Sequence, residues 1–96
     1  MNVHWTDRAK ARLKLLEEHI AQDSPQVARE TVLRILKRSV QIGELPQSGR
    51  KVREFDDPLV REVLERPYRI VYQISDDRVD VLTVLHYRQL FPGDLP

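Results

Sequence analysis

The fold is decided by a stretch near the C-terminus, Tyr68-Arg69-Ile70-Val71-Tyr72-Gln73-Ile74, which leads through Ser75-Asp76-Asp77-Arg78 into Val79-Asp80-Val81-Leu82-Thr83-Val84-Leu85. In the first segment, Tyr and Ile stand at every second position, a period typical of a β-strand with one buried face. The middle segment has the composition of a turn. The last segment is apolar on nearly every position of both faces, as expected of a central strand. The stretch therefore predicts two adjacent strands at the middle of a sheet.

The segments beside these strands are less decisive. Residues 60–65 (Val-Arg-Glu-Val-Leu-Glu) fit a strand or a helix by pattern alone. Before them, the Pro and Gly of residues 45–50 (Leu-Pro-Gln-Ser-Gly-Arg) indicate a loop. After the last strand, residues 86–93 are expected to leave the sheet. If residues 60–65 form a strand, the C-terminal half is an antiparallel meander of about three strands.

The N-terminal half begins with a short predicted strand and a first helix. Residues 2–5 fit a strand, and Thr6 is placed to cap the helix that follows, since its hydroxyl can accept a hydrogen bond from an early N–H group. Apolar residues then recur at spacings of four, three and four, which is one stripe of an amphipathic helix: Ala9, Leu13, Leu16 and Ile20.

A second helix is predicted directly after the first. Ser24 fits the N-cap and Pro25 the first helical position, a specific start signal. We expect Gly43 to end this helix as a left-handed C-cap residue. The short connection predicts an antiparallel pair of helices. The helical stripe continues through Ala28, Val32, Ile35, Ser39 and Ile42, and Leu36 widens it.

These elements together predict an α+β fold within one domain, residues 1–96. A short N-terminal strand and an antiparallel helical hairpin pack on one face of a three- to four-stranded antiparallel sheet. The other face of that sheet is then open, or covered by a partner.

Composition narrows the class of protein. The 96 residues include 16 Lys and Arg, 15 Asp and Glu, and no Cys, for a net charge of +1. The balance excludes a general polycation that coats nucleic acid, although a local basic patch remains possible. The absence of Cys excludes disulfides and thiolate metal sites and favours the cytoplasm. The N-terminus does not resemble a signal peptide, and no apolar run is long enough to span a membrane.

Arginine is the residue type that points to function. Twelve of the 16 basic residues are Arg, the side chain best suited to bidentate binding of phosphates and carboxylates. The candidates in the sheet half are Arg50, Arg53, Arg61, Arg69 and Arg88. Arg69 has two interpretations: an ion pair across the sheet with Glu62 or Glu65, or a clamp that faces a groove and binds phosphate or carboxylate.

His86 and Tyr87 form a second candidate, at the end of the last strand. A histidine exchanges protons near neutral pH, and a tyrosine stacks on bases or donates its hydroxyl. The alternative is a purely structural strand end, with Tyr87 inward and His86 outward. Common enzyme motifs are absent, and the three His residues lack the spacing of a metal site. We therefore expect no metal and no cofactor.

Several segments, taken in order, resemble the RelE/ParE superfamily of bacterial toxins, the toxic halves of type II toxin–antitoxin pairs. The likeness covers most of the chain. The segments that carry it are Trp5-Thr6, Ser24-Pro25-x-x-Ala28, Leu45-Pro46-x-x-Gly49-Arg50, Val60-Arg61-Glu62, Tyr68-Arg69-Ile70-Val71-Tyr72 and His86-Tyr87-Arg88. The resemblance implies two N-terminal helices against an antiparallel sheet, and an antitoxin that wraps and neutralises the toxin, so that oligomers form through the antitoxin complex.

Two activities diverge within this superfamily. ParE-like members poison DNA gyrase, whereas RelE-like members cut mRNA on the ribosome. For the ribonuclease activity, the resemblance implies that Arg69 stabilises the transition-state phosphate and that His86 and Tyr87 lie near the scissile bond. Members rich in catalytic Lys place lysines on the middle strands, but Lys51 is the only lysine after Lys37.

The resemblance therefore favours the ParE-like branch, with Arg50, Arg53, Arg61 and Arg88 binding the partner or nucleic acid. An endoribonuclease that uses Glu54 or His86 as its base is the alternative. A third hypothesis is a degenerate member that binds only its antitoxin.

Overall fold

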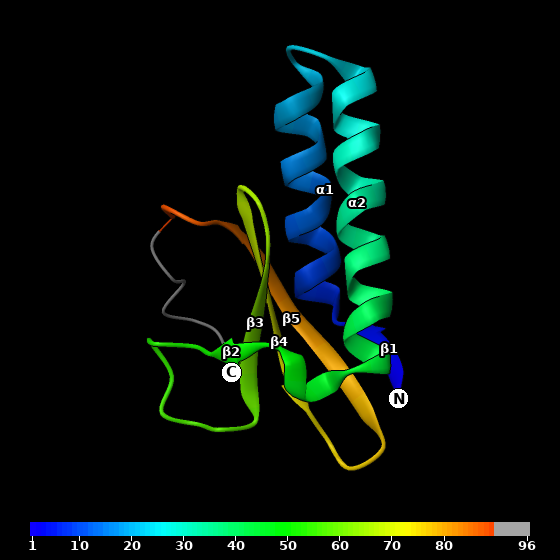
Figure 1. The fold of residues 1–96 in the computed structure, drawn as a ribbon. Coiled ribbons are helices and arrows are strands. Elements are labelled where there is room, and N and C mark those ends of the chain that lie inside the picture. Colours follow the sequence, from blue (N-terminus) through cyan, green and yellow to red (C-terminus); the bar gives the residue numbers. More distant parts are fainter. Residues whose placement is uncertain (90–96) are drawn as a thin grey trace.

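The computed structural model describes residues 1–89, which form two helices and a five-stranded sheet (Figure 1). The helices are α1 (Asp7–Ala21) and α2 (Pro25–Glu44), followed by the short 3-10 helix η1 (Pro46–Ser48). The strands are β1 (Asn2–Trp5), β2 (Arg50–Lys51), β3 (Val60–Glu65), β4 (Tyr68–Ile74) and β5 (Arg78–His86). Residues 60–65, ambiguous by pattern, are thus a strand.

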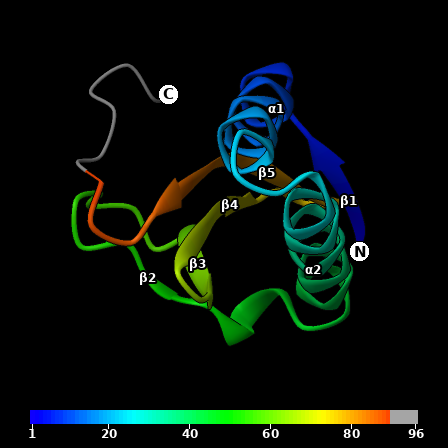
Figure 2. The same ribbon diagram turned by 90° about the horizontal axis from the view of Figure 1, so that it is seen from above.

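The sheet has the strand order β1-β5-β4-β3-β2. The meander β3-β4-β5 is antiparallel, as predicted, and the helical hairpin packs on one face of the sheet, which curves around α2 (Figure 2). The α+β fold is confirmed. The sheet has five strands rather than three or four, and it is mixed because β1 pairs with β5 in parallel. A parallel neighbour requires a long crossover connection, and here the helical hairpin and the strands β2 to β4 all lie between β1 and β5 in the chain.

Both helices begin at the predicted caps. The Thr6 hydroxyl oxygen accepts a hydrogen bond from Ala9 N at 3.1 Å, and its O–H donates to the Val81 carbonyl at 2.9 Å. The Ser24 hydroxyl accepts from Val27 N at 3.2 Å. Thr6 therefore caps α1 and also fixes the start of that helix to β5.

Gly43 does not end α2 in the way that the sequence predicts. The helix continues through Glu44, and Gly43 is buried with no positive φ. A Cβ atom at this position would lie 2.6 Å from the Met1 carbonyl oxygen and 2.7 Å from Val3 Cγ2. The N-terminal ammonium group also donates to the Gly43 carbonyl at 2.8 Å. Glycine stands here because β1 passes directly against the helix.

The main core lies between the helices and the sheet. It uses the residues that alternate along β4 together with the inward stripe of α2, as the two periods predict. Trp5 packs at its edge and donates its indole N–H to the Ser39 hydroxyl at 3.3 Å. The buried residues of this cluster are Ala9, Ile35, Ile42, Val63, Ile70, Tyr72, Ile74, Val79, Val81 and Val84.

The opposite face of the sheet is only partly open. After β2 the chain folds back over this face, and Val52 and Phe55 pack against Val60, Val71 and Leu82. The chain therefore covers one half of the second face itself. The other half lies beneath the groove described below. Within residues 1–89, no helix combines the length and apolarity that crossing a membrane requires.

Candidate functional site: a cationic groove on the second face of the sheet

A groove of about 690 Å³ lies on the face of the sheet opposite the helices. Five basic side chains and two carboxylates line it, next to an apolar and aromatic patch. The basic residues are Arg50, Lys51, Arg53, Arg66 and Arg69, the acids are Glu54 and Glu62, and the remaining residues are Leu64, Pro67, Tyr68 and Tyr87.

The base of the groove is an ion pair between β3 and β4. Arg69 stands opposite Leu64 in the register, so its side chain projects from the same face as Glu62. Arg69 Nε donates to Glu62 Oε1 at 2.9 Å, and Nη2 donates to the same oxygen at 2.5 Å. The predicted pairing with Glu62 is confirmed, whereas Glu65 lies 3.8 Å from Arg34 Nε instead.

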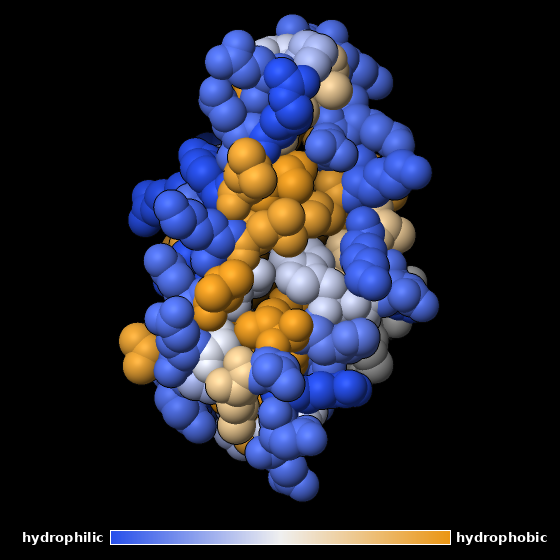
Figure 3. Space-filling model, turned by 90° about the vertical axis from the view of Figure 1, so that its right-hand side faces the viewer, coloured by the Kyte–Doolittle hydropathy of each residue, from blue (hydrophilic) through white to orange (hydrophobic). Residues whose placement is uncertain are grey.

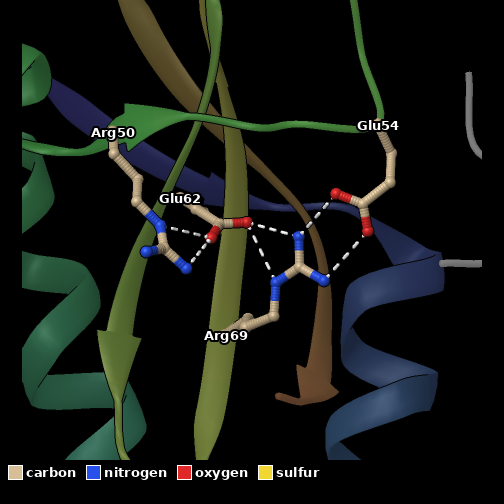
Figure 4. Close-up of polar contacts among 4 residues, drawn as sticks. All are labelled: Arg50, Glu54, Glu62 and Arg69. Carbon is tan, nitrogen blue, oxygen red and sulfur yellow. Dashed lines mark hydrogen bonds and ion pairs between the residues drawn. The ribbon is translucent and has the colours of Figure 1, made fainter. Parts of the chain in front are cut away.

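Two further side chains complete this network (Figure 4). From β2, Arg50 Nε donates to Glu62 Oε2 at 2.7 Å. From the loop after β2, Glu54 meets Arg69 fork to fork, with both of its oxygens 3.1 Å from a guanidinium nitrogen. Glu62 is 2% exposed, whereas the Glu54 side chain is 38% exposed. The network therefore has a buried carboxylate at its centre and a solvent-facing carboxylate at its rim.

The pKa values of Glu54 and Arg69 reflect this arrangement. Hydrogen bonds from Arg69 hold the pKa of Glu54 below its ordinary value, although partial burial opposes them. Burial alone disfavours the charged form of Arg69. The hydrogen bonds to Glu54 and Glu62 outweigh that effect and raise the pKa of the guanidinium above its ordinary value. Both groups are therefore ionised at neutral pH, and the site is a guanidinium flanked by two carboxylates.

The other predicted arginines divide between the two faces. Arg50 and Arg53 line the groove. Arg61 does not, because it stands opposite Tyr72 on the helix-facing side, and its Nη1 donates to the Gly49 carbonyl at 2.9 Å. Arg88 follows β5 and lies over the ring of Tyr87, with its guanidinium carbon 5.2 Å from the ring centroid.

Of the three residues proposed for ribonuclease chemistry, His86 and Tyr87 stack ring on ring with centroids 4.9 Å apart, but only Tyr87 lines the groove of Arg69. His86 stands opposite Tyr68 in the sheet, with the two rings edge to face at 6.0 Å, and it lines a second cavity of about 360 Å³ beside α1. The structural interpretation with Tyr87 inward is wrong: that side chain is 49% exposed, and His86 is the more buried of the two. The reversal follows from the register, which turns His86 to the helix face.

Two cationic residues of the groove were not singled out from the sequence. Lys51 follows Arg50 on β2, and Arg66 lies in the turn between β3 and β4. The only signal for Lys51 is its place in a run of basic residues. Arg66 becomes a groove residue only through the pairing of β3 with β4. Among residues 1–89, no three His, Asp or Glu side chains gather in a way that would hold a metal ion.

Comparisons with known proteins agree on the family. The family model described as "ParE toxin of type II toxin-antitoxin system, parDE" matches residues 3–91. The curated protein "Putative toxin Y4kP" of Sinorhizobium fredii (strain NBRC 101917 / NGR234) is 35% identical over 92 residues, which are 94% of this chain and 92% of that protein.

A solved structure is also similar. The structure described as "Chromosomal ParDE TA system from P. aeruginosa" superposes with a TM-score of 0.74 at 24% identity, and the match covers 90% of this chain and 95% of that chain. At that level of identity, the likeness concerns the fold. Because the family model and the curated relative each match nearly the whole sequence, the chain belongs to the ParE toxin family of type II toxin–antitoxin systems.

Proposed function

We propose that this toxin arrests growth by poisoning DNA gyrase in the cytoplasm and that a cognate antitoxin neutralises it. The observation that carries the proposal is the match of the ParE family model to residues 3–91. The site supports a binding role, because the guanidinium of Arg69 is already occupied by Glu54 and Glu62. His86, the candidate base of a ribonuclease, lines a different cavity from Arg69.

A supercoiling assay with purified gyrase and relaxed plasmid tests the target directly. Added toxin is expected to abolish supercoiling and to accumulate cleaved plasmid, since a poison traps the enzyme on broken DNA. Toxin preincubated with its antitoxin is the control, and supercoiling should then return. Unchanged supercoiling at saturating toxin would refute the gyrase proposal.

The antitoxin is proposed to dock on the outer side of α2. Leu33, Leu36 and Val40 recur there at spacings of three and four, and their exposed fractions are 66%, 38% and 61%. Figure 3, which views this side of the molecule, shows a band of apolar atoms bordered by hydrophilic ones. An exposed apolar stripe of this spacing suits helix-in-groove docking.

Co-purification with the product of the adjacent small gene tests the antitoxin proposal. Leu33→Glu and Val40→Glu should abolish co-purification, because a charge cannot be buried in an apolar interface without a partner. Val27→Glu is the matched control: Val27 is an exposed apolar residue of the same helix, 48% exposed, and lies outside the stripe. Equal loss in all three variants, or no complex with the wild type, would count against this surface.

A ribosome-dependent mRNA endonuclease is the second candidate. One observation favours it: Arg69 and Tyr87 line the same groove, as a phosphate-binding guanidinium and a neighbouring phenol would. Primer extension on translated mRNA should then show codon-specific cuts that disappear in Arg69→Lys, which keeps the charge and loses the fork. If wild-type toxin leaves mRNA intact, this candidate fails.

A further inference from the structure

The groove already holds a carboxylate that does not belong to the sheet. Glu54 comes from the loop after β2 and presents both oxygens to Nη1 and Nη2 of Arg69 at 3.1 Å (Figure 4). This fork-to-fork geometry is the one by which arginine recognises carboxylates. An internal side chain therefore shows which ligand chemistry the outer edge of the Arg69 guanidinium accepts.

The two carboxylates on Arg69 differ in how easily they are replaced. Glu62 is almost fully buried and shares its second oxygen with Arg50, so it is a permanent counter-ion. Glu54 is more than one third exposed, and an incoming carboxylate would make the same fork-to-fork contact with Arg69 that Glu54 gives up. An incoming carboxylate can therefore exchange with Glu54 at little cost, while the Glu62 pair stays in place.

The rim of the groove offers further charge for an acidic ligand. Neither Lys51 nor Arg66 pairs with a carboxylate anywhere in the part of the chain that the structure describes. Arg53 is exposed beside Glu54. The groove thus has an excess of positive charge around Arg69, which attracts a ligand with more than one negative charge.

The neighbouring backbone suits an extended ligand. On its outer side β3 pairs with β2 at Arg61 and Glu62, and β2 is only two residues long. Within residues 1–89, the outer edge of residues 63–65 has no strand beside it. Leu64, Pro67 and Tyr68 line the groove next to this edge. An open strand edge beside an apolar patch favours a peptide over a phosphodiester chain, because peptides recognise such edges by strand addition.

From these contacts we propose that the groove is a carboxylate-binding site, that Glu54 occupies it in the free toxin, and that an acidic side chain on an extended segment of the antitoxin displaces Glu54 from Arg69. This inference rests on the antitoxin binding proposed above. Glu54 is then an internal competitor: its carboxylate stays on Arg69 until the antitoxin binds and displaces it.

Peptide binding tests the site without any antitoxin or gyrase. The probe is a fluorescein-labelled peptide of four Glu-Thr repeats, in which every Glu lies on one face when the peptide is extended. Glu54→Gln removes the internal competitor and should bind the probe at least about five-fold more tightly than the wild type by fluorescence anisotropy. The Arg69 Nε–H signal in NMR spectra should shift in the same titration.

A matched variant separates the site from net charge. Asp56 lies on the same loop, is exposed, and pairs with no basic residue of the described chain. Asp56→Asn removes the same charge and should change probe affinity less than about two-fold. Lys51→Ala should weaken binding, and a Gln-Thr peptide should bind none of the proteins. If Glu54→Gln and Asp56→Asn increase probe affinity equally, or if neither increases it, the proposed carboxylate site is wrong.

Binding of the antitoxin to the toxin variants tests whether the antitoxin supplies the displacing carboxylate. Surface plasmon resonance with the adjacent gene product should show slower dissociation from Glu54→Gln than from Asp56→Asn, because only the first variant lacks the competitor. Equal dissociation rates, together with peptide binding as expected, would refute the antitoxin as the ligand. A product that binds none of the toxins would instead overturn the antitoxin proposal of the previous section, and the peptide result would still stand.

Discussion

The two faces of the sheet are built by different means. The helix-facing side is packed with aliphatic residues of β4, β5 and α2, whereas the second face carries four charged residues in one network. Arg69 and Ile70 are neighbours on β4 and point to these opposite faces. The first face is held by packing, which is non-directional. The part of the second face that carries the groove is held by ion pairs, which require particular partners and remain open to exchange, whereas an apolar cluster around Val52 packs the rest.

This difference indicates which face of the sheet can bind a ligand. A close-packed core has no room for a ligand, since packing there resembles an organic crystal. The network of the second face has an exposed end at Glu54, and the groove beside it contains Lys51 and Arg66, which pair with no carboxylate of residues 1–89. Binding is therefore expected where the fold uses charge, and four substitutions test how far the two faces differ.

The largest effect is expected from Arg69→Ala. This change leaves Glu62, which is 2% exposed, with Arg50 as its remaining cation, and breaking a buried pair costs about 3–5 kcal/mol. Urea unfolding followed by circular dichroism measures the loss. The double variant Arg69→Met with Glu62→Leu should be closer to the wild type, since it leaves no buried charge. If the double variant is the less stable of the two, the ion-pair explanation is wrong.

The adjacent substitution Ile70→Ala probes the packed face of the same strand. Ile70 is fully buried in the main core, and truncation leaves a cavity that costs about 2–5 kcal/mol. The loss should not depend on salt, whereas that of the Arg69 variant should shrink slightly, because salt screens the solvent-facing pair with Glu54 while the buried pair with Glu62 is screened far less. Unfolding curves at low and high salt compare the two. An equal salt response would erase the distinction between the faces.

Tyr72→Phe removes one hydroxyl, and with it two hydrogen bonds, from the packed face. The Tyr72 hydroxyl donates to the Pro46 carbonyl at 2.6 Å and accepts from Gly49 N at 3.0 Å, so its loss strands a buried N–H at a cost of about 1–3 kcal/mol.

The same residue makes a pH prediction. Burial raises the pKa of Tyr72, so its contribution is complete below the unfolded value of about 10 and declines as pH rises through the folded pKa. Thermal melts above pH 9 should show a decline in the wild type that Tyr72→Phe lacks. If the melting temperatures of the two proteins decline in parallel, Tyr72 is not the cause of the pH dependence.

The smallest effect is expected from Glu54→Gln at the exposed end of the network. The pKa of Glu54 is lowered, chiefly by hydrogen bonds from Arg69, so its contribution is present above the ordinary value near 4.3 and disappears as pH falls through the folded pKa. The variant should melt slightly below the wild type at pH 7, and the gap should close as pH falls through the lowered folded pKa of Glu54. A gap that persists at low pH would show that the charge is not its cause.

Much of the fold follows from local sequence signals. The caps at Thr6 and Ser24 and the alternation along β4 predicted their elements, because each is set by residues within one turn or one strand. Gly43 shows where such reasoning fails: its role depends on Met1, 42 residues away. β2 escaped prediction because two residues carry no periodicity, and only pairing with β3 defines them as a strand.

The positions of the candidate residues, not their roles, can be compared with the prediction. The sequence put Arg50, Arg53, Arg61 and Arg88 in a partner-binding set and Arg69 in a catalytic set with His86 and Tyr87. Members of both sets line one groove, whereas Arg61 and His86 face the helix side. The alternation of a strand assigns side chains to two faces, but a short segment does not reveal which face turns toward the helices. The choice between Glu62 and Glu65 as the partner of Arg69 likewise required the register. The additional partner, Glu54, was not predicted, because it comes from a loop whose path the strand pattern does not give.

By itself, the sequence determined the class of fold, the two helices, the central strands and the membership of a toxin family, because periodicity, caps and ordered motifs are properties of the chain. The tertiary structure alone decided which arginines share a groove and that Glu54 occupies its guanidinium. The physical reason is that an ion pair depends on distance and orientation between residues from different elements. Those quantities exist only once the strands have paired and the loop after β2 has folded back over the sheet.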